Sequence, residues 1–124
     1  MTVATITTHT APAKSSAEVE HEQARDAFYQ KLAHYRQAQV DLLNQADQIR
    51  YTRNHDDDEV DRVAGQHSDT FKAVMMCPAV TPSQIADKID AMSSYGEVEM
   101  HTDFDELVEA LVRDSRKVLR GRCD

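Results

Sequence analysis

The sequence predicts an all-α protein of four helices, and three observations support that class. The 124-residue chain holds only three glycines and three prolines, so it is poor in the turns that a protein of many short strands needs. Apolar residues recur at spacings of three and four, which is the helical period. The prolines fall outside these periodic segments. We expect a single helical domain over residues 17–121, because a chain of 14.0 kDa supports one hydrophobic core.

The N-terminal segment differs in composition from the rest. Residues 1–16 are rich in Thr, Ala and Ser and carry few bulky apolar side chains. Because such a segment buries too little apolar surface to offset its loss of chain entropy, it is predicted to be a disordered tail. Residues 17–52 contain no glycine or proline. Their apolar side chains alternate at spacings of four and three, which predicts one long helix.

This long helix carries a heptad seam. The seam consists of Phe28, Leu32, Tyr35, Leu42 and Ile49, with Gln39 and Ala46 at two further positions. We expect it to pack inside its own chain, as half of an antiparallel helical hairpin, because Gln39 and Ala46 weaken a dimer interface. A homo-oligomer formed through the first helix is the alternative.

A second helix is predicted over residues 57–76. Its acidic first turn stabilises the positive end of the helix dipole, and Asn54 or Asp56 is placed to cap it. Pro78 ends the helix, because the residue before a proline is pushed out of the helical conformation. The predicted buried line is Val60, Val63, His67, Phe71 and Val74.

Two shorter helices are predicted to follow. Thr81 and Pro82 are typical first residues of a helix, Gln84 is placed to complete a capping box, and Gly96 ends the helix. Its apolar line is Ile85, Ile89 and Met92. Residues 97–100 are predicted to be a loop. Thr102 is expected to cap the last helix, which ends at Gly121 and has as its apolar face Phe104, Leu107, Val108, Leu111, Val112, Val118 and Leu119.

Charge is divided unevenly along the chain. Residues 1–53 carry six basic and six acidic side chains, residues 54–112 carry three and fourteen, and residues 113–124 carry five and two. If the acids of the middle block lie at one end of the hairpin, they form a negative patch suited to a partner protein with a basic surface. The predicted patch is Asp56, Asp57, Asp58, Glu59, Asp61, Glu97, Glu99, Asp103, Asp105 and Glu106.

The sequence predicts no catalytic residue, cofactor or metal site. The acidic run at residues 55–59 lacks the alternating ligands and the central glycine of a calcium loop. Pairs such as Asp58 with Asp61 and Glu106 with Glu109 are the kind that magnesium-dependent all-α nucleotide hydrolases use. Helix capping already explains acids at these positions, so such a hydrolase is only the third-ranked function and we expect no enzyme.

A row of basic side chains follows one side of the last helix. It consists of Arg113, Arg116, Lys117 and Arg120. Such a row contacts phosphates in nucleic-acid-binding proteins. In a chain with a net charge of −8, it is better explained by the helix dipole and by pairing with the chain's own acids. We therefore expect no direct binding of nucleic acid.

Cysteine content and hydropathy bear on the compartment. Two cysteines are too few for a disulfide framework, and a Cys77–Cys123 bridge would require the C-terminus to fold back onto the second helix. The sequence shows no signal peptide and no apolar run of about 18 residues. A reduced, cytoplasmic protein that does not enter a membrane is expected.

Part of the chain resembles a known group of proteins. The stretch Cys77-Pro78-Ala79, then Ile85-Ala86-Asp87-Lys88-Ile89 and a closing helix from Asp103 to Asp114, is similar to the C-terminal part of small uncharacterised helical proteins of bacterial chromosomes and prophages. The resemblance implies a bacterial or phage accessory protein and carries over no activity or site.

The function predicted from these observations is that of a small, non-enzymatic protein-interaction protein. The alternative is an acidic inhibitor, of the kind that phages deploy against nucleic-acid-binding defence complexes. Such an inhibitor would use the negative patch to occupy a basic groove.

Overall fold

The computed structural model describes residues 15–52 and 56–123, with the side chains of all of these except Thr52, Arg122 and Cys123. Its elements are α1 (Ser16–Thr52), α2 (Asp57–Met76), α3 (Pro82–Tyr95), the short 3₁₀ helix η1 (Val98–Met100) and α4 (Phe104–Cys123). No strand occurs in these residues, so the predicted all-α class is confirmed. Residues 1–14 of the predicted tail lie outside the described part of the chain, and Ser16 already begins α1.

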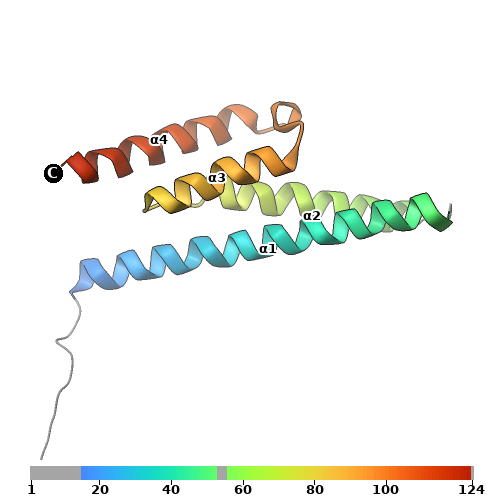
Figure 1. The fold of residues 1–124 in the computed structure, drawn as a ribbon, viewed down its shortest axis with the longest axis horizontal. Helices are drawn as coiled ribbons and strands as arrows, with labels where there is room; N and C mark the ends of the chain where they lie inside the picture. Colours follow the sequence, from blue (N-terminus) through green and yellow to red (C-terminus); the bar gives the residue numbers. More distant parts are fainter. Residues whose placement is uncertain (1–14, 53–55, 124) are drawn as a thin grey trace, which may run out of the picture.

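The arrangement is a long hairpin with two further helices packed beside it. Helices α1 and α2 run antiparallel, α3 returns along the pair, and α4 lies on the far side of α3 from α1 (Figure 1). The hairpin is longer than the α3–α4 pair, so one end of it extends past the turn that holds η1 (Figure 1). The predicted long N-terminal hairpin with two shorter helices is confirmed.

Both ends of α2 follow the predicted chemistry. Asp56 caps α2, since its Oδ1 accepts a hydrogen bond from the Asp58 backbone N–H at 2.9 Å. Asn54, the other predicted cap, lies outside the described residues. At the other end, α2 stops at Met76, and Cys77 before Pro78 is extended with φ −72° and ψ 128°. The predicted end of this helix is confirmed.

Helix α3 also begins and ends where expected. Thr81 Oγ1 accepts from the Gln84 backbone N–H at 3.2 Å, and Pro82 occupies the first turn. The Gln84 side chain, however, accepts from the Val80 N–H at 2.9 Å, one residue before the position of a standard capping box. Gly96 ends α3 with φ +91°, a conformation that favours glycine.

Two boundaries near the C-terminus differ from the prediction. Residues 97–100, predicted to be a loop, contain η1, where the His101 N–H donates to the Val98 carbonyl at 2.9 Å. Helix α4 begins at Phe104 rather than after Thr102, since the first α4 bond runs from the Leu107 N–H to the Asp103 carbonyl at 3.0 Å. It continues through Gly121, because that glycine keeps a helical conformation.

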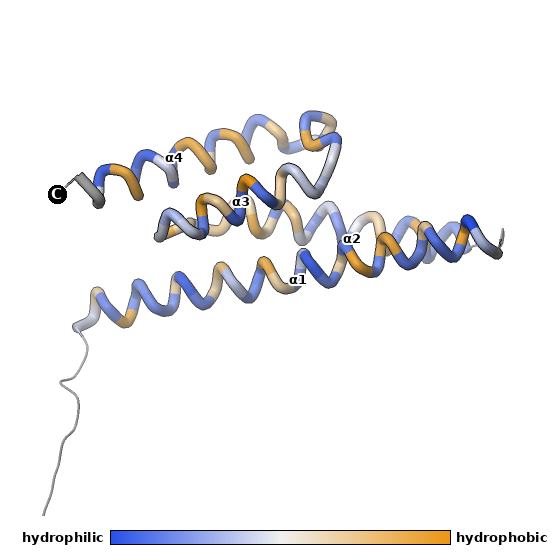
Figure 2. The backbone as a smooth tube through the Cα atoms, viewed as in Figure 1, coloured by the Kyte–Doolittle hydropathy of each residue, from blue (hydrophilic) through white to orange (hydrophobic). Residues whose placement is uncertain are grey.

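The hydrophobic core lies where α2, α3 and α4 meet the first half of α1. Figure 2 shows that each of these helices has hydrophobic stretches between hydrophilic ones. Burial of each large apolar side chain contributes about 1.5–3 kcal/mol. The core cluster consists of Phe28, Leu32, Tyr35, Phe71, Val74, Met75, Cys77, Ala79, Ala91 and Leu107.

All four predicted apolar lines are only partly buried. In the α1 seam, Phe28, Leu32 and Tyr35 are buried, whereas Leu42, beside the end of α3, and Ile49 are half-buried. Ile89 is exposed, and the preceding residue of α3, Lys88, is buried instead. On α4 both Val112 and Leu119 are exposed, and on α2 Val60 is half-buried. The buried part of the seam packs within its own chain.

Candidate interaction surfaces

A buried ion pair holds α3 and α4 to the connection that follows α2. Lys88 Nζ lies 2.6 Å from Asp114 Oδ2, and the two side chains are 0 and 2 % exposed. Nζ also donates to the Met75 carbonyl at 2.7 Å, and the same Asp114 oxygen accepts from the Ala79 N–H at 3.1 Å. Burial lowers the pKa of Lys88, while the Asp114 carboxylate opposes that shift. The pair is closed to solvent and fixes the α2–α3 connection against α4.

Sequence reasoning missed this pair, although a signal was present. Lys88 stands three residues after Ile85 and four before Met92, so it occupies the helix face that these apolar residues define. A lysine at such a position is either an error in the pattern or a buried, paired charge. Asp114 lies between Ala110 and Val118 on α4 in the same way.

A second buried polar group is His67. Its ring is stacked between the rings of Tyr35 and Tyr95, at centroid distances of 5.4 and 4.8 Å. Desolvation lowers the pKa of His67, and its Nε2 has no hydrogen-bond partner among the described residues. Beside it lies a shallow pocket of about 520 Å³, which Leu42 and Glu97 also line. The neutral imidazole serves here as an aromatic core group.

The predicted acidic patch does not gather at one point. Asp56, Asp57, Asp58 and Asp61 are exposed at the start of α2. Asp103, just before α4, instead forms an ion pair with Lys72 at 2.9 Å.

The number of residues along α2 gives the distance between these two groups of acids. Lys72 is fifteen residues after Asp57, which is about 22 Å at 1.5 Å per residue. Glu97 lies between the two groups, beside Ala64 in the pocket next to His67. The predicted acids are therefore spread along α2, and Asp103 is already neutralised by a cation of this chain. The remaining predicted acids are Glu59, half-buried and paired with Arg62, and Glu99, Asp105 and Glu106, which are exposed.

One end of the α1–α2 hairpin stands clear of the other helices. Gln39 Nε2 donates to the Ser94 carbonyl at 3.1 Å, and Leu42 lines the pocket beside Tyr95. Beyond these contacts, α1 continues alongside α2 alone (Figure 1). We call residues 40–51 of α1 and 57–63 of α2 the hairpin arm. On α1, no side chain between residues 39 and 51 is fully buried.

The arm exposes several large apolar side chains. Val40, Leu43 and Tyr51 are 49, 61 and 77 % exposed. At 100° per residue, these three fall on one face of α1, opposite the side that carries Leu42 and Ile49. The acids at the start of α2 lie at the tip of the same arm. The arm thus combines an exposed apolar face with negative charge.

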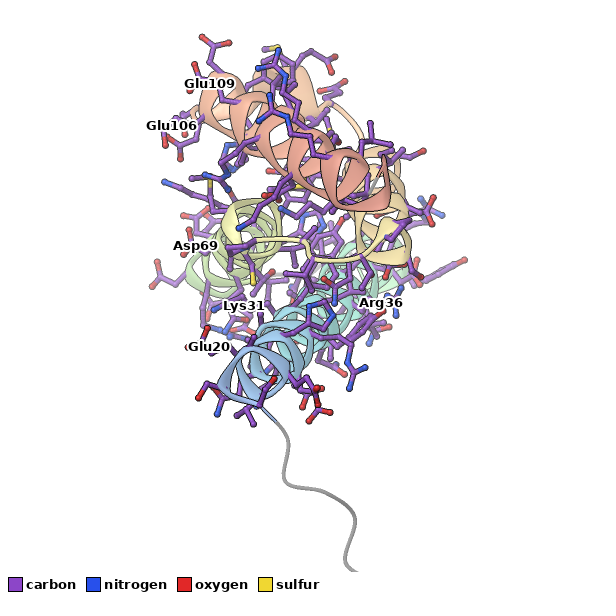
Figure 3. All side chains as sticks on the ribbon, turned by 90° about the vertical axis from the view of Figure 1, so that its left-hand side faces the viewer. Glu20, Lys31, Arg36, Asp69, Glu106 and Glu109 are labelled. Atoms are coloured by element: carbon purple, nitrogen blue, oxygen red, sulfur yellow. The ribbon has the colours of Figure 1, made fainter. Side chains whose placement is uncertain are left out.

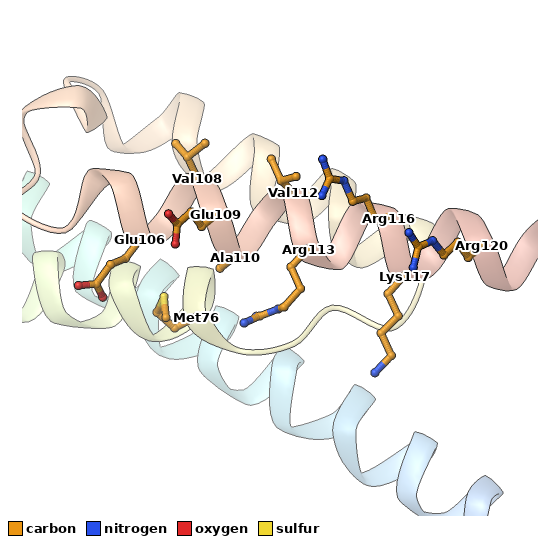
Figure 4. Close-up of a pocket in the computed structure, with 10 residues that line it drawn as sticks. All are labelled: Met76, Glu106, Val108, Glu109, Ala110, Val112, Arg113, Arg116, Lys117 and Arg120. Atoms are coloured by element: carbon orange, nitrogen blue, oxygen red, sulfur yellow. The ribbon is translucent and has the colours of Figure 1, made fainter.

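A second surface follows α4. A groove of about 830 Å³ runs along the outer side of this helix and the end of α2 (Figure 4). Glu106 and Glu109 project outward from α4, away from the core (Figure 3). The lining residues are Met76, Glu106, Val108, Glu109, Ala110, Val112, Arg113, Arg116, Lys117 and Arg120. The basic row predicted from the sequence is therefore one part of a mixed groove.

The described residues also bear on metal binding and membrane insertion. In residues 15–52 and 56–123, no three His, Cys, Asp or Glu side chains lie where they could hold a metal ion. None of the helices in this part of the chain has the length and apolar character that crossing a bilayer requires. Cys77 is a free, buried thiol, and burial raises its pKa.

Comparison of the chain with protein-family models, with curated proteins and with solved structures found no match in any of the three.

Proposed function

We propose that this protein is a non-enzymatic helical protein that binds another protein through the hairpin arm. The observation that carries the proposal is the exposed apolar face of Val40, Leu43 and Tyr51. Transfer of a large apolar side chain from water into an interface contributes about 1.5–3 kcal/mol. Three such side chains on one face are enough to anchor a partner, because a few buried side chains carry most of the energy of an interface.

The charge of the arm specifies the chemistry of that partner. Asp57, Asp58 and Asp61 are exposed at the tip, and Asp47 is exposed on α1. A partner that covers the arm therefore needs an apolar surface with basic side chains at its rim. The charged rim makes the rate of association sensitive to salt, while the apolar centre sets most of the affinity.

Affinity capture from an extract of the native host tests this proposal. The bait is compared with the arm variant Leu43→Ser/Tyr51→Ser and with the control variant Val19→Ser/Tyr29→Ser. The control removes side chains of α1 that are 38 and 41 % exposed but lie outside the arm. We expect the wild-type and control baits to capture the same partner and the arm variant to lose it. Equal capture by all three baits would refute the proposal.

The acidic inhibitor is the second candidate, and the exposed acids at the start of α2 favour it. Its test is a bait with Asp56→Asn, Asp57→Asn, Asp58→Asn and Glu59→Gln. This bait keeps an oxygen acceptor at the cap of α2. A partner that binds nucleic acid, and that is lost from this bait and at high salt but kept by the arm variant, would favour the inhibitor. Capture that needs only the apolar face would exclude it.

A further inference from the structure

The outer face of α4 carries charges of opposite sign in its two halves. Glu106 and Glu109 occupy the first half, and Arg113, Arg116 and Arg120 the second (Figure 4). At 100° per residue, these five side chains fall within about 80° of one another around the helix, so they form a single stripe. The acidic half is followed by a basic half. Two copies of the stripe in antiparallel orientation therefore place unlike charges opposite each other.

Most of these charges are not used inside the chain. Within the part of the chain that the structure describes, Glu109, Arg116 and Arg120 take part in no ion pair or hydrogen bond. Arg113 is engaged through contacts of 3.4 Å to Asp114 Oδ1. Glu106 adds to the rise in the pKa of Lys72, which is caused mainly by the ion pair of Lys72 with Asp103. The sequence suggested that the basic row pairs with the chain's own acids, but among the described side chains only Arg113 of this row does so.

Apolar side chains accompany the charged stripe. Val112 is 41 % exposed at the middle of α4, and Val108 lies one turn before it. Met76, at the end of α2, is 36 % exposed and forms part of the groove wall. Leu119 is 59 % exposed near the C-terminal end of the helix. The surface thus has an apolar part to bury in addition to charges to pair.

We propose that this surface pairs with the same surface of a second copy of the chain, α4 against α4 in antiparallel orientation. A twofold axis near Val112 places Glu106 and Glu109 of each copy opposite the Arg116 and Arg120 half of the other. The two Val112 side chains then meet at the axis. A parallel pairing would place acids against acids, so charge selects the antiparallel arrangement. The contact is isologous and closes as a dimer.

The dimer adds a property to the protein that one chain lacks. The hairpin arm and the outer face of α4 are formed by different residues, so pairing through α4 leaves both arms uncovered. A dimer presents two arms, and a partner with two matching sites binds it with an avidity above the affinity of one arm. The dimer itself does not depend on the function proposed for the arm.

Charge reversal tests the pairing directly. One variant, Glu106→Lys/Glu109→Lys, makes the stripe wholly basic, and another, Arg116→Glu/Arg120→Glu, leaves Arg113 as the one cation among four acids of the stripe. Sedimentation equilibrium of the wild type is expected to give twice the 14.0 kDa mass of one chain. Each variant alone is expected to dimerise at least about tenfold more weakly, because four attractive contacts become repulsive. The two variants mixed in equal amounts are expected to recover the dimer.

The control variant is Glu20→Lys/Asp90→Lys, which reverses two exposed acids on α1 and α3. It changes the net charge by as much as the first variant and is expected to dimerise like the wild type. Circular dichroism verifies that all variants keep their helix content. A monomeric wild type, a species larger than a dimer, or variants that fail to recover the dimer on mixing would each overturn the proposal.

Discussion

The body of the molecule, which is the part where all four helices pack together, and the hairpin arm are built from the same kind of helix. They differ in the contacts that stabilise them. In the body, four helices enclose a core, and the buried Lys88–Asp114 pair joins α3, α4 and the α2–α3 connection. In the arm, the two helices pack mainly against each other, with Leu42 also beside Tyr95, and α1 buries no side chain completely between residues 39 and 51. The comparison separates residues that stabilise the fold from residues that are available for binding.

The difference follows from the number of neighbours that a helix has. A helix in a two-helix arm can bury one narrow stripe, whereas a helix inside a four-helix body is covered on more than one side. Val40, Leu43 and Tyr51 remain 49, 61 and 77 % exposed, so the fold leaves about half or more of their surface in water. We therefore expect substitutions in the body to change stability and substitutions in the arm to change binding.

The largest loss of stability is expected from Asp114→Ala, a substitution in the body. The substitution leaves Lys88 Nζ without its carboxylate partner, and the Ala79 N–H loses its acceptor. Removal of one partner of a buried ion pair costs about 3–5 kcal/mol, because the other charge stays buried and uncompensated. Since domains of this size are stable by only about 5–15 kcal/mol, the variant should unfold at much lower urea concentration. Urea denaturation followed by circular dichroism measures the change.

A double substitution provides the control for that prediction. Lys88→Met/Asp114→Leu replaces both charges with apolar side chains of similar size. It is expected to be far more stable than Asp114→Ala, because no uncompensated charge remains. If the double variant is as unstable as the single one, the loss at Asp114→Ala comes from the broken Ala79 contact or from packing, and the role assigned to the ion pair is wrong.

Smaller losses of stability are expected from substitution of two leucines of the α1 seam, and these losses compare the two regions directly. Leu32 is 3 % exposed in the body, and Leu42 is half-buried where the arm begins. Leu32→Ala removes a fully buried side chain and should cost about 2–5 kcal/mol. Leu42→Ala should cost about 1 kcal/mol, because water already reaches its site. Equal losses of unfolding free energy in the two variants would contradict the division into body and arm.

The sequence predicted the helices well because their signals are local. The cap at Asp56, the start at Thr81 and Pro82, and the end at Gly96 depend on residues within one turn of each boundary. The end of α4 was predicted wrongly at Gly121, because a glycine there also accepts the helical conformation. Such a position is decided by the residues that follow, for which the sequence offered no stop signal.

The surfaces were harder to predict than the helices. The acidic patch was inferred from charge along the sequence, but its residues spread out in space because Asp103 lies beside Lys72, far along α2 from Asp57. The difference between Leu32 and Leu42 within one heptad seam depends on how far α3 reaches along α1. No periodic pattern in α1 contains that information, since it is set by packing between distant segments.

The smallest predicted effect is a pH dependence of the stability. It tests whether the stacked rings of Tyr35, His67 and Tyr95, at the border of body and arm, are part of the body. The pKa of His67 is lowered by burial between Tyr35 and Tyr95, so the folded protein binds a proton there less readily than the unfolded chain. Well above pH 6.5, the usual pKa of histidine, both states are neutral at this residue and its contribution is constant. As the pH falls below 6.5, the unfolded state takes up the proton first, so the free energy of unfolding decreases, by at most about 1.4 kcal/mol per pH unit.

Urea denaturation of the wild type and of His67→Phe between pH 7.5 and about 5 isolates this term, since the phenylalanine ring keeps the stack but binds no proton. The wild type should lose stability more steeply than the variant over this range. Parallel pH profiles would show that His67 titrates alike in both states. Its ring would then be accessible to water, and the stack would belong to the arm rather than to the packed body.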